Sequence, residues 1–287
     1  MGGDGLDQRV GAAAGVPVTG STRLHGGCVA DVRRLDLADG RRVVVKAGSG
    51  SRAGLEIEGF MLDRLAATGS IPVPRVLHAE PDLLILEHIE NDGRRSDRGE
   101  AEAAAMLARL HAITRDRFGF ERDTLIGSLH QPNGDMDHWP RFFAERRLLH
   151  MGRRAHEAGS IPGSTLTKLE KLAADIDRLI DPPPARPALV HGDIWSGNVL
   201  WHEGRVAAFI DPATYFADPE IELAFIDLFG CFGRTFWDHY GDFGSIRPGF
   251  WEARRDLYNI YPLLVHATLF GGGYGASVTR TLASLGY

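Results

Sequence analysis

The segment LVHGDIWSGNVLW, Leu189 to Trp201, constrains the fold of this chain more than any other stretch. An apolar run that ends at Val190 is typical of a buried strand, and a second apolar run begins at Val199. The second run reaches a turn at Glu203-Gly204 and continues into residues 206–210, a pattern that predicts a β-hairpin. Polar side chains set between such strands are expected to gather at one end of the hairpin.

Three oxygen-bearing side chains in this region fit phosphoryl transfer. Asp193 and Asn198 are followed across the hairpin by Asp211, which is the order of Asp, Asn and Asp in protein-kinase-like phosphotransferases. Asn198 and Asp211 offer hard oxygen ligands that suit a Mg²⁺ ion bridging nucleotide phosphates. We therefore predict ATP and Mg²⁺ as cofactors, Asn198 and Asp211 as metal ligands, and Asp193 as the base that accepts a proton from an attacking hydroxyl.

Other polar residues near this segment have less definite roles. His191 is better explained as a loop residue that bonds the backbone and braces the catalytic segment than as a participant in the chemistry. Trp195 is either a packing residue or a platform for the substrate. Asp218 and Glu220 open a later helix, and a cap is favoured for Asp218 over contact with a substrate cation.

A nucleotide clamp is expected upstream of these residues. Lys46 ends the apolar run 43–45, and an ion pair with Glu58 of the following helix would hold it on the α- and β-phosphates. Glu56 is a competing partner, and Glu58 is preferred because it lies closer to the apolar run that starts at Phe60. A strand-end lysine that only reaches solvent is the alternative.

Two further segments are candidates for nucleotide contact. Gly26 and Gly27 in LHGGCVA would let backbone N–H groups approach the phosphates, although a plain hairpin turn has the same sequence pattern. Glu87, His88 and Ile89 follow a predicted strand, and their backbone is expected to act as the hinge that bonds the adenine.

The order of predicted elements indicates an α+β fold of two lobes. Residues 19–48 predict a hairpin that turns at Asp39-Gly40, and a helix over 52–69 and two short strands follow. Helix formers dominate beyond residue 90, so we expect a small β-rich lobe over 1–90 and a larger, mostly helical lobe over 91–287. The resulting class is a bilobal protein-kinase-like fold.

Two local expectations in the second lobe can be tested directly. Apolar residues at three- and four-residue spacing predict one helix over 164–180, with Ser164 as its cap and three prolines from Pro182 ending it. The pair Arg146-Arg147 is interpreted, like other short basic runs, as part of a solvated face.

Composition excludes several functions. A formal net charge of −6 argues against nucleic acid, because phosphate backbones are bound by clustered Lys and Arg. Two distant cysteines, Cys28 and Cys231, form no zinc pattern and favour a reducing compartment. Cys28 lies in the expected phosphate-covering loop, where oxidation of an exposed thiol would weaken ATP binding. No apolar segment suits a membrane helix or a signal peptide, so we expect a cytoplasmic protein that is a monomer or a weak dimer.

Several motifs together resemble the fructosamine kinase (ketosamine 3-kinase) family. They are LVHGDIWSGNVLW, FIDPATYFADPEIELAFIDLFGCF, LFGGGY and IGSLHQPNGDMDHWPRFFAERRL, which span most of the chain. Related aminoglycoside and choline kinases share the His-Gly-Asp segment and the later aspartate, but generally lack the tryptophan at Trp195 and the long continuation after Asp211.

The resemblance implies ATP-dependent phosphorylation of a ketosamine, usually at the third hydroxyl of its sugar, as a deglycation or repair reaction. It implies the same roles for Asp193, Asn198, Asp211 and for Lys46 with Glu58. It also places a substrate contact at His266, although the family commonly has asparagines where this chain has Val265 and Thr268.

The sequence leaves two alternatives and several details open. One alternative is a kinase with the same fold that acts on an aminoglycoside or a choline-like amino alcohol, and the other is a nucleotide-binding module without turnover. Which ketosamine is used, and whether it is free or linked to protein, does not follow from the sequence.

Overall fold

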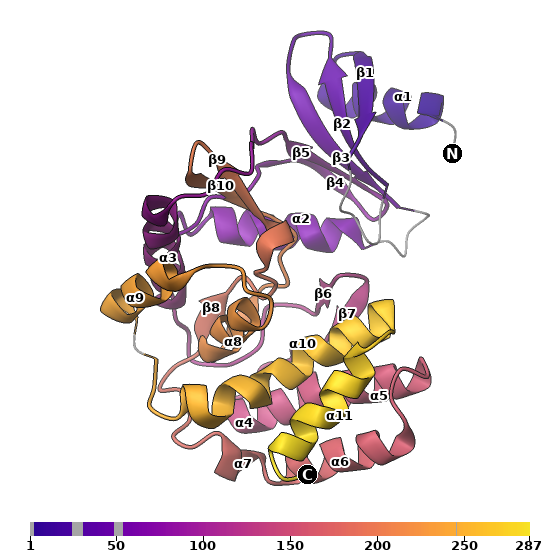
Figure 1. Cartoon of the computed structure of the whole chain (residues 1–287). Coiled ribbons are helices and arrows are strands. Elements are labelled where there is room, and N and C mark those ends of the chain that lie inside the picture. Colours follow the sequence, from indigo (N-terminus) through magenta and orange to yellow (C-terminus); the bar gives the residue numbers. More distant parts are fainter. Residues whose placement is uncertain (1–2, 25–30, 49–53, 245) are drawn as a thin grey trace.

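The computed structural model describes residues 3–24, 31–48, 54–244 and 246–287 (Figure 1). Its N-terminal part is an antiparallel sheet in the order β1-β2-β3-β5-β4. The strands are β1 (Val18–Arg23), β2 (Asp31–Leu37), β3 (Arg42–Ala47), β4 (Val76–Glu80) and β5 (Leu83–Glu87). The turn at Asp39-Gly40 is confirmed, with Gly40 at φ 85°, but the predicted hairpin is the second half of a three-strand meander that begins with β1.

Two helices cover the two faces of this sheet. Helix α1 (Gly3–Ala14), which the sequence patterns did not predict, places Leu6 and Val10 in a cluster with Val43 and Val45 of β3. Helix α2 (Leu55–Ala66) packs on the opposite face, where the alternating positions of β3 contribute Val44 and Lys46. Strand β3 is therefore packed on both sides.

The remainder of the chain is mostly helical and lies below the sheet in Figure 1. Its helices are α3 (Asp97–His111), α4 (Trp139–Phe142), a π-helical stretch (Phe143–Leu149), α5 (His150–Glu157), α6 (Gly163–Ala174), α7 (Ile176–Leu179), α8 (Glu220–Leu228), α9 (Arg234–Phe243), a second π-helical stretch (Phe250–Arg254), α10 (Arg255–Phe270) and α11 (Tyr274–Ser284). Three two-stranded pairs complete it: β6 (Thr124–Ile126) with β7 (Leu129–Gln131), β8 (Ala188–Val190) with β11 (Tyr215–Ala217), and β9 (Val199–His202) with β10 (Arg205–Phe209). The predicted α+β class is confirmed, whereas the lobe boundary at residue 90 stays a prediction.

The helix predicted over 164–180 is wrong in two details. It begins at Gly163 behind Pro162, so Ser164 lies in the first turn and is not the cap. It breaks at Asp175, whose carboxylate accepts a hydrogen bond from the hydroxyl of the C-terminal Tyr287 at 2.7 Å. The break therefore lies at a residue that contacts the far end of the chain.

Arg147 is buried, so its interpretation as part of a solvated face is wrong. Its guanidinium lies 4.0 Å from the ring centroid of Tyr215 and donates to the carbonyl oxygen of Pro132 and to Oδ1 of Asn133. Aromatic faces attract a desolvated cation, and the two oxygens accept hydrogen bonds from its terminal N–H groups, whereas Nε has no partner among the described residues.

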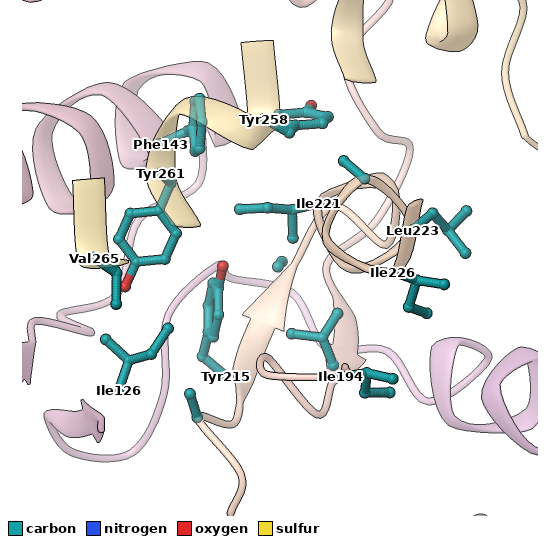
Figure 2. Close-up of a cluster of buried hydrophobic side chains, with 14 of the residues drawn as sticks. Ile126, Phe143, Ile194, Tyr215, Ile221, Leu223, Ile226, Tyr258, Tyr261 and Val265 are labelled. Carbon is teal, nitrogen blue, oxygen red and sulfur yellow. The ribbon is translucent and has the colours of Figure 1, made fainter. Parts of the chain in front are cut away.

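The main hydrophobic core lies beneath the segment that follows β8 (Figure 2). Ile194, directly after Asp193, is fully buried in this core together with Tyr215 of β11 and Ile221 and Ile226 of α8. Burial of that one side chain anchors residues 191–198, called the catalytic segment below, in the core.

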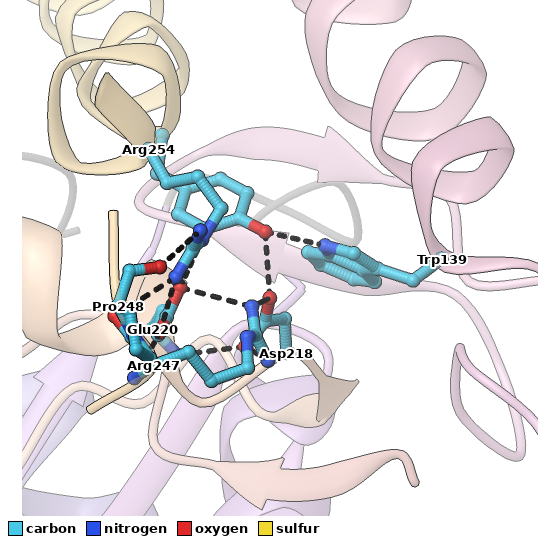
Figure 3. A network of polar contacts seen from close by, with 7 residues as sticks. Trp139, Asp218, Glu220, Arg247, Pro248 and Arg254 are labelled. Atoms are coloured by element: carbon cyan, nitrogen blue, oxygen red, sulfur yellow. Dashed lines mark hydrogen bonds and ion pairs between the residues drawn. The ribbon is translucent and has the colours of Figure 1, made fainter. Parts of the chain in front are cut away.

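A buried polar network fixes the start of α8 to the start of α10 (Figure 3). Arg254 donates to both carboxylate oxygens of Glu220, at 2.7 and 3.0 Å, and Arg247 bonds Glu220 and Asp218. Asp218 also accepts the hydroxyl hydrogen of Tyr258 and the N–H of Glu220, so it does cap the following turn. Neither carboxylate is available to a substrate cation.

We expect Arg254→Met to destabilise the protein by about 2–4 kcal/mol, because buried Glu220 would lose two charge-assisted hydrogen bonds and keep Arg247 as its cationic partner. Exposed Arg153→Met is the matched control and should change the free energy of unfolding by less than about 0.5 kcal/mol. Denaturant unfolding followed by circular dichroism measures both values. Equal stability of the two variants would contradict the prediction.

Candidate active site

The catalytic segment turns sharply where β8 ends. Gly192 has φ +90°, and a Cβ atom there would lie 2.3 Å from the carbonyl oxygen of Ala213, so only glycine fits. His191 is buried, its Nδ1 accepts the N–H of Asp193 at 3.3 Å, and its carbonyl oxygen accepts the N–H of Ala213. These backbone contacts match the bracing role predicted for His191.

Asp193 lies at the end of this turn in a desolvated position. Burial and the negative charge of Asp211 together raise the pKa of Asp193 to about 8, although a hydrogen bond from Asn198 opposes the shift. The amide Nδ2 of Asn198 donates to both the backbone oxygen and Oδ2 of Asp193, at 2.9 and 3.0 Å. A carboxylate with a raised pKa is well suited to take up a proton near neutral pH.

Asn198 and Asp211 are brought together by the β9–β10 hairpin. The strands pair Val199 with Phe209, and one step further the N–H of Ile210 donates to the carbonyl oxygen of Asn198 at 3.0 Å. Asp211 has φ +56°, a left-handed conformation that Asp tolerates better than most residues, and this turns its side chain out of the strand. The sequence prediction that these two residues meet is confirmed.

Lys46 is the contact between the sheet and this segment. Its Nζ lies 2.7 Å from Oε1 of Glu58 and also pairs with Oδ1 of Asp211. Glu58 is therefore the partner, as preferred, whereas Oε2 of Glu56 is buried with no hydrogen-bond partner among the described residues. Burial would lower the pKa of Lys46, but the two carboxylates raise it above its ordinary value, so the ammonium stays charged.

One cavity of about 310 Å³ is lined by all four of these polar residues, Lys46, Asp193, Asn198 and Asp211. The sheet side contributes Val32, Lys46 and Glu58, and the opposite side contributes the ends of α8, α10 and α11. Trp195 and His266, the predicted substrate contacts, both line it, and Trp195 is 38% exposed. The ring of Trp195 lies against Gly197, where a Cβ atom would come within 2.4 Å of it.

Two predicted nucleotide contacts do not appear at this cavity. Gly26 and Gly27 lie outside the described residues, as does Cys28. The N–H groups of Glu87 and His88 donate to the carbonyl oxygens of Arg75 and Arg42, at 3.0 and 3.4 Å, so they are not free for adenine. The N–H of Ile89 is the donor that remains in the predicted hinge, and the carbonyl oxygen of Ile89 already accepts a hydrogen bond from Nδ2 of Asn91 at 3.1 Å.

Three buried residues that the sequence analysis did not predict, Glu222, His111 and Tyr240, form a hydrogen-bonded chain that supports the catalytic segment. Glu222 of α8 is buried, and its Oε1 accepts the N–H of Gly192 at 2.6 Å. Its Oε2 lies 2.8 Å from Nε2 of His111, whose Nδ1 lies 2.8 Å from the hydroxyl of Tyr240. The only sequence signal is an acidic residue inside the apolar run Ile221–Ile226, and nothing local connects it with Gly192.

The pKa of Glu222 follows from these contacts. Burial alone would raise it, but the bond and charge of His111 together with the N–H of Gly192 lower it below its ordinary value. Glu222 is therefore ionised at neutral pH and acts as a charged acceptor, the stronger kind, for the Gly192 N–H.

We expect Glu222→Ala to lower kcat by about tenfold or more while changing ATP affinity much less. The buried N–H of Gly192 would lose its acceptor, at a cost of about 1–3 kcal/mol that is felt at Asp193. Glu222→Gln, which keeps an acceptor oxygen, should recover part of kcat. Steady-state kinetics well below the melting temperature measures both.

Arg254→Met is the control for lost stability, because it removes a buried ion pair without touching the catalytic segment. Its kcat should stay near that of the parent protein. If Glu222→Ala and Arg254→Met retain the same kcat, the positioning role of Glu222 is wrong.

Known proteins resemble this chain over most of its length. The fructosamine kinase family profile matches residues 7–285. A protein of Synechocystis named probable ketoamine kinase is 37% identical over 235 residues, covering 79% of this chain and 77% of its own. The chloroplastic protein-ribulosamine 3-kinase of Arabidopsis thaliana is 31% identical over 265 residues, covering 88% and 78%.

Solved structures agree with this assignment. A crystal structure from Thermobifida fusca, provisionally named a fructosamine-3-kinase, superposes with a TM-score of 0.89 at 30% identity and covers 99% of both chains. An aminoglycoside phosphotransferase, solved with AMP-PNP and hygromycin B, superposes with a TM-score of 0.66 at 20% identity over 97% of this chain and 98% of its own. That likeness shows the fold alone, which is the predicted protein-kinase-like one. With the profile matched from end to end, this chain belongs to the fructosamine kinase family.

Proposed function

We propose that this protein is a ketosamine kinase that transfers the terminal phosphoryl group of ATP to a sugar hydroxyl of a fructosamine or ribulosamine. The observation that supports it most is the meeting of Lys46, Asp193, Asn198 and Asp211 in one cavity of a family member. ATP use follows from membership of a kinase family, whereas the individual residue roles below are proposals.

Asn198 and Asp211 fit a Mg²⁺ ion that is bound together with the nucleotide. Nδ2 of Asn198 is engaged by Asp193, which leaves its carbonyl oxygen Oδ1 as the ligand atom. A Mg²⁺ ion bound with a nucleotide takes few protein ligands, because phosphate oxygens and water complete its coordination. The ion would neutralise charge on the transferred phosphoryl group.

Lys46, held by Glu58, is placed to bind the phosphates. A phosphoryl transfer asks the protein mainly for positioning and charge neutralisation, and a desolvated ammonium supplies both. Its contact with Asp211 aligns the phosphate site with the metal site. Gly26, Gly27 and the N–H of Ile89 remain proposed contacts for the phosphates and the adenine.

Asp193 is the proposed base. Its Oδ2 accepts the Asn198 amide, so Oδ1 is the atom left to receive the proton. The acceptor hydroxyl oxygen forms the new bond to the γ-phosphorus, the bond from that phosphorus to the bridging oxygen of ADP breaks, and the hydroxyl proton passes to Asp193. Trp195 and His266 are proposed to orient the sugar.

Asp193→Asn should lower kcat by about 10²–10⁴, the usual contribution of a general base, while ATP binding and the melting temperature change little. The amide is nearly the same size and can still bond Asn198, but it cannot take up the proton. Coupled measurement of ADP release gives kcat, and calorimetric titration gives ATP affinity. Full turnover in this variant would show that Asp193 is not the base.

The function itself is tested by ATP consumption with a panel of acceptors. Fructosyl-lysine, ribulosyl-lysine and a glycated protein should be phosphorylated, with the modified hydroxyl identified by NMR. Phosphorylation of only an aminoglycoside or a choline-like acceptor would replace the proposed substrate class. No turnover with any acceptor, with ATP still bound, would favour a nucleotide-binding module.

A further inference from the structure

One part of the cavity wall is built from aromatic rings around His266. The ring centroid of His266 lies 4.6 Å from Phe229, 5.4 Å from Phe270 and 5.1 Å from Tyr274. These three rings come from the end of α8, the end of α10 and the start of α11, and all three line the cavity. Phe270 is 49% exposed, so its face remains open to a ligand.

His266 is uncharged in this setting. Its Nδ1 lies 2.8 Å from the carbonyl oxygen of Pro262, which can only accept, so Nδ1 carries the hydrogen and Nε2 has a free lone pair. Burial lowers the pKa of His266 below its ordinary value, which agrees with a neutral ring. The aromatic cluster therefore holds no positive charge that would repel a cation.

The acidic side chains of the described cavity wall all have partners of their own. Glu58 and Asp211 pair with Lys46, and Asp193 accepts the Asn198 amide. The wall formed by the aromatic cluster offers π faces and no carboxylate within the described residues. A cation bound here would meet aromatic faces in place of an ion pair.

We propose that Phe229, Phe270 and Tyr274 bind the alkylammonium nitrogen of the ketosamine by cation–π contact, so that the site selects sugars carrying one positive charge. This inference rests on the proposed function. An aliphatic amine attached through methylene carbons is protonated at neutral pH, and a desolvated cation gains about 0.5–2 kcal/mol on an aromatic face. A polyamine such as an aminoglycoside would bring several charges to a wall with no counter-ions, and is disfavoured.

The test compares two acceptors that differ only in charge. They are 1-deoxy-1-(alkylamino)fructose and the uncharged 1-O-alkyl ether of fructose with the same alkyl chain. We expect kcat/KM to favour the amine by about 2- to 30-fold, the factor that corresponds to a cation–π contact. Phe270→Leu and Tyr274→Leu should reduce this ratio toward one, and Phe270→Tyr, which keeps the ring, should preserve it.

Phe243→Leu is the matched control, because Phe243 is an exposed aromatic residue that does not line the cavity. It should leave the ratio unchanged. Equal use of amine and ether by the parent protein, or an unchanged ratio in both leucine variants at the aromatic cluster, would overturn this inference and leave the proposed function standing. Failure to phosphorylate either acceptor would overturn the proposed function, and this inference with it.

Discussion

One buried cation, the ammonium group of Lys46, connects the two parts of the active site. It contacts Glu58 from α2 and Asp211 from the segment after β10, so the sheet and the catalytic segment share one charge centre. A buried ion keeps its charge only while its partners remain in place. The alignment of the proposed phosphate site with the proposed metal site therefore depends on the contact of Lys46 with Glu58 and Asp211.

The catalytic segment is held from several directions at once. Ile194 anchors it in the core, His191 joins it to the backbone around Ala213, and Glu222 accepts the N–H of Gly192 from below. The left-handed conformation of Asp211 is costly for a residue with a Cβ atom, and it persists because the surrounding contacts determine the backbone. Asp193, the proposed base, is thus presented to the cavity by a rigid support, which favours a fixed geometry for proton transfer.

Local sequence patterns predicted much of this arrangement. They failed where contacts between residues far apart in the sequence determine the structure. The hairpin that joins Asn198 to Asp211, and the preference for Glu58 over Glu56, follow from spacing within a few residues of each motif. Helix α1 has no strong pattern of its own and forms against the sheet. The break at Asp175 has no strong local signal and lies where the chain contacts distant Tyr287, and the buried position of Arg147 depends on rings supplied by other elements. Glu222 shows the same limit, since its partner Gly192 is identified only once the chain is folded.

Strand β3 has side chains packed into both layers that enclose the sheet, α1 on one face and α2 on the other. Such a strand cannot bend by itself without opening voids in both layers, because protein interiors are close-packed. A displacement of β3 during nucleotide entry or release would therefore carry the three layers together as a rigid body, and Lys46 would travel with them.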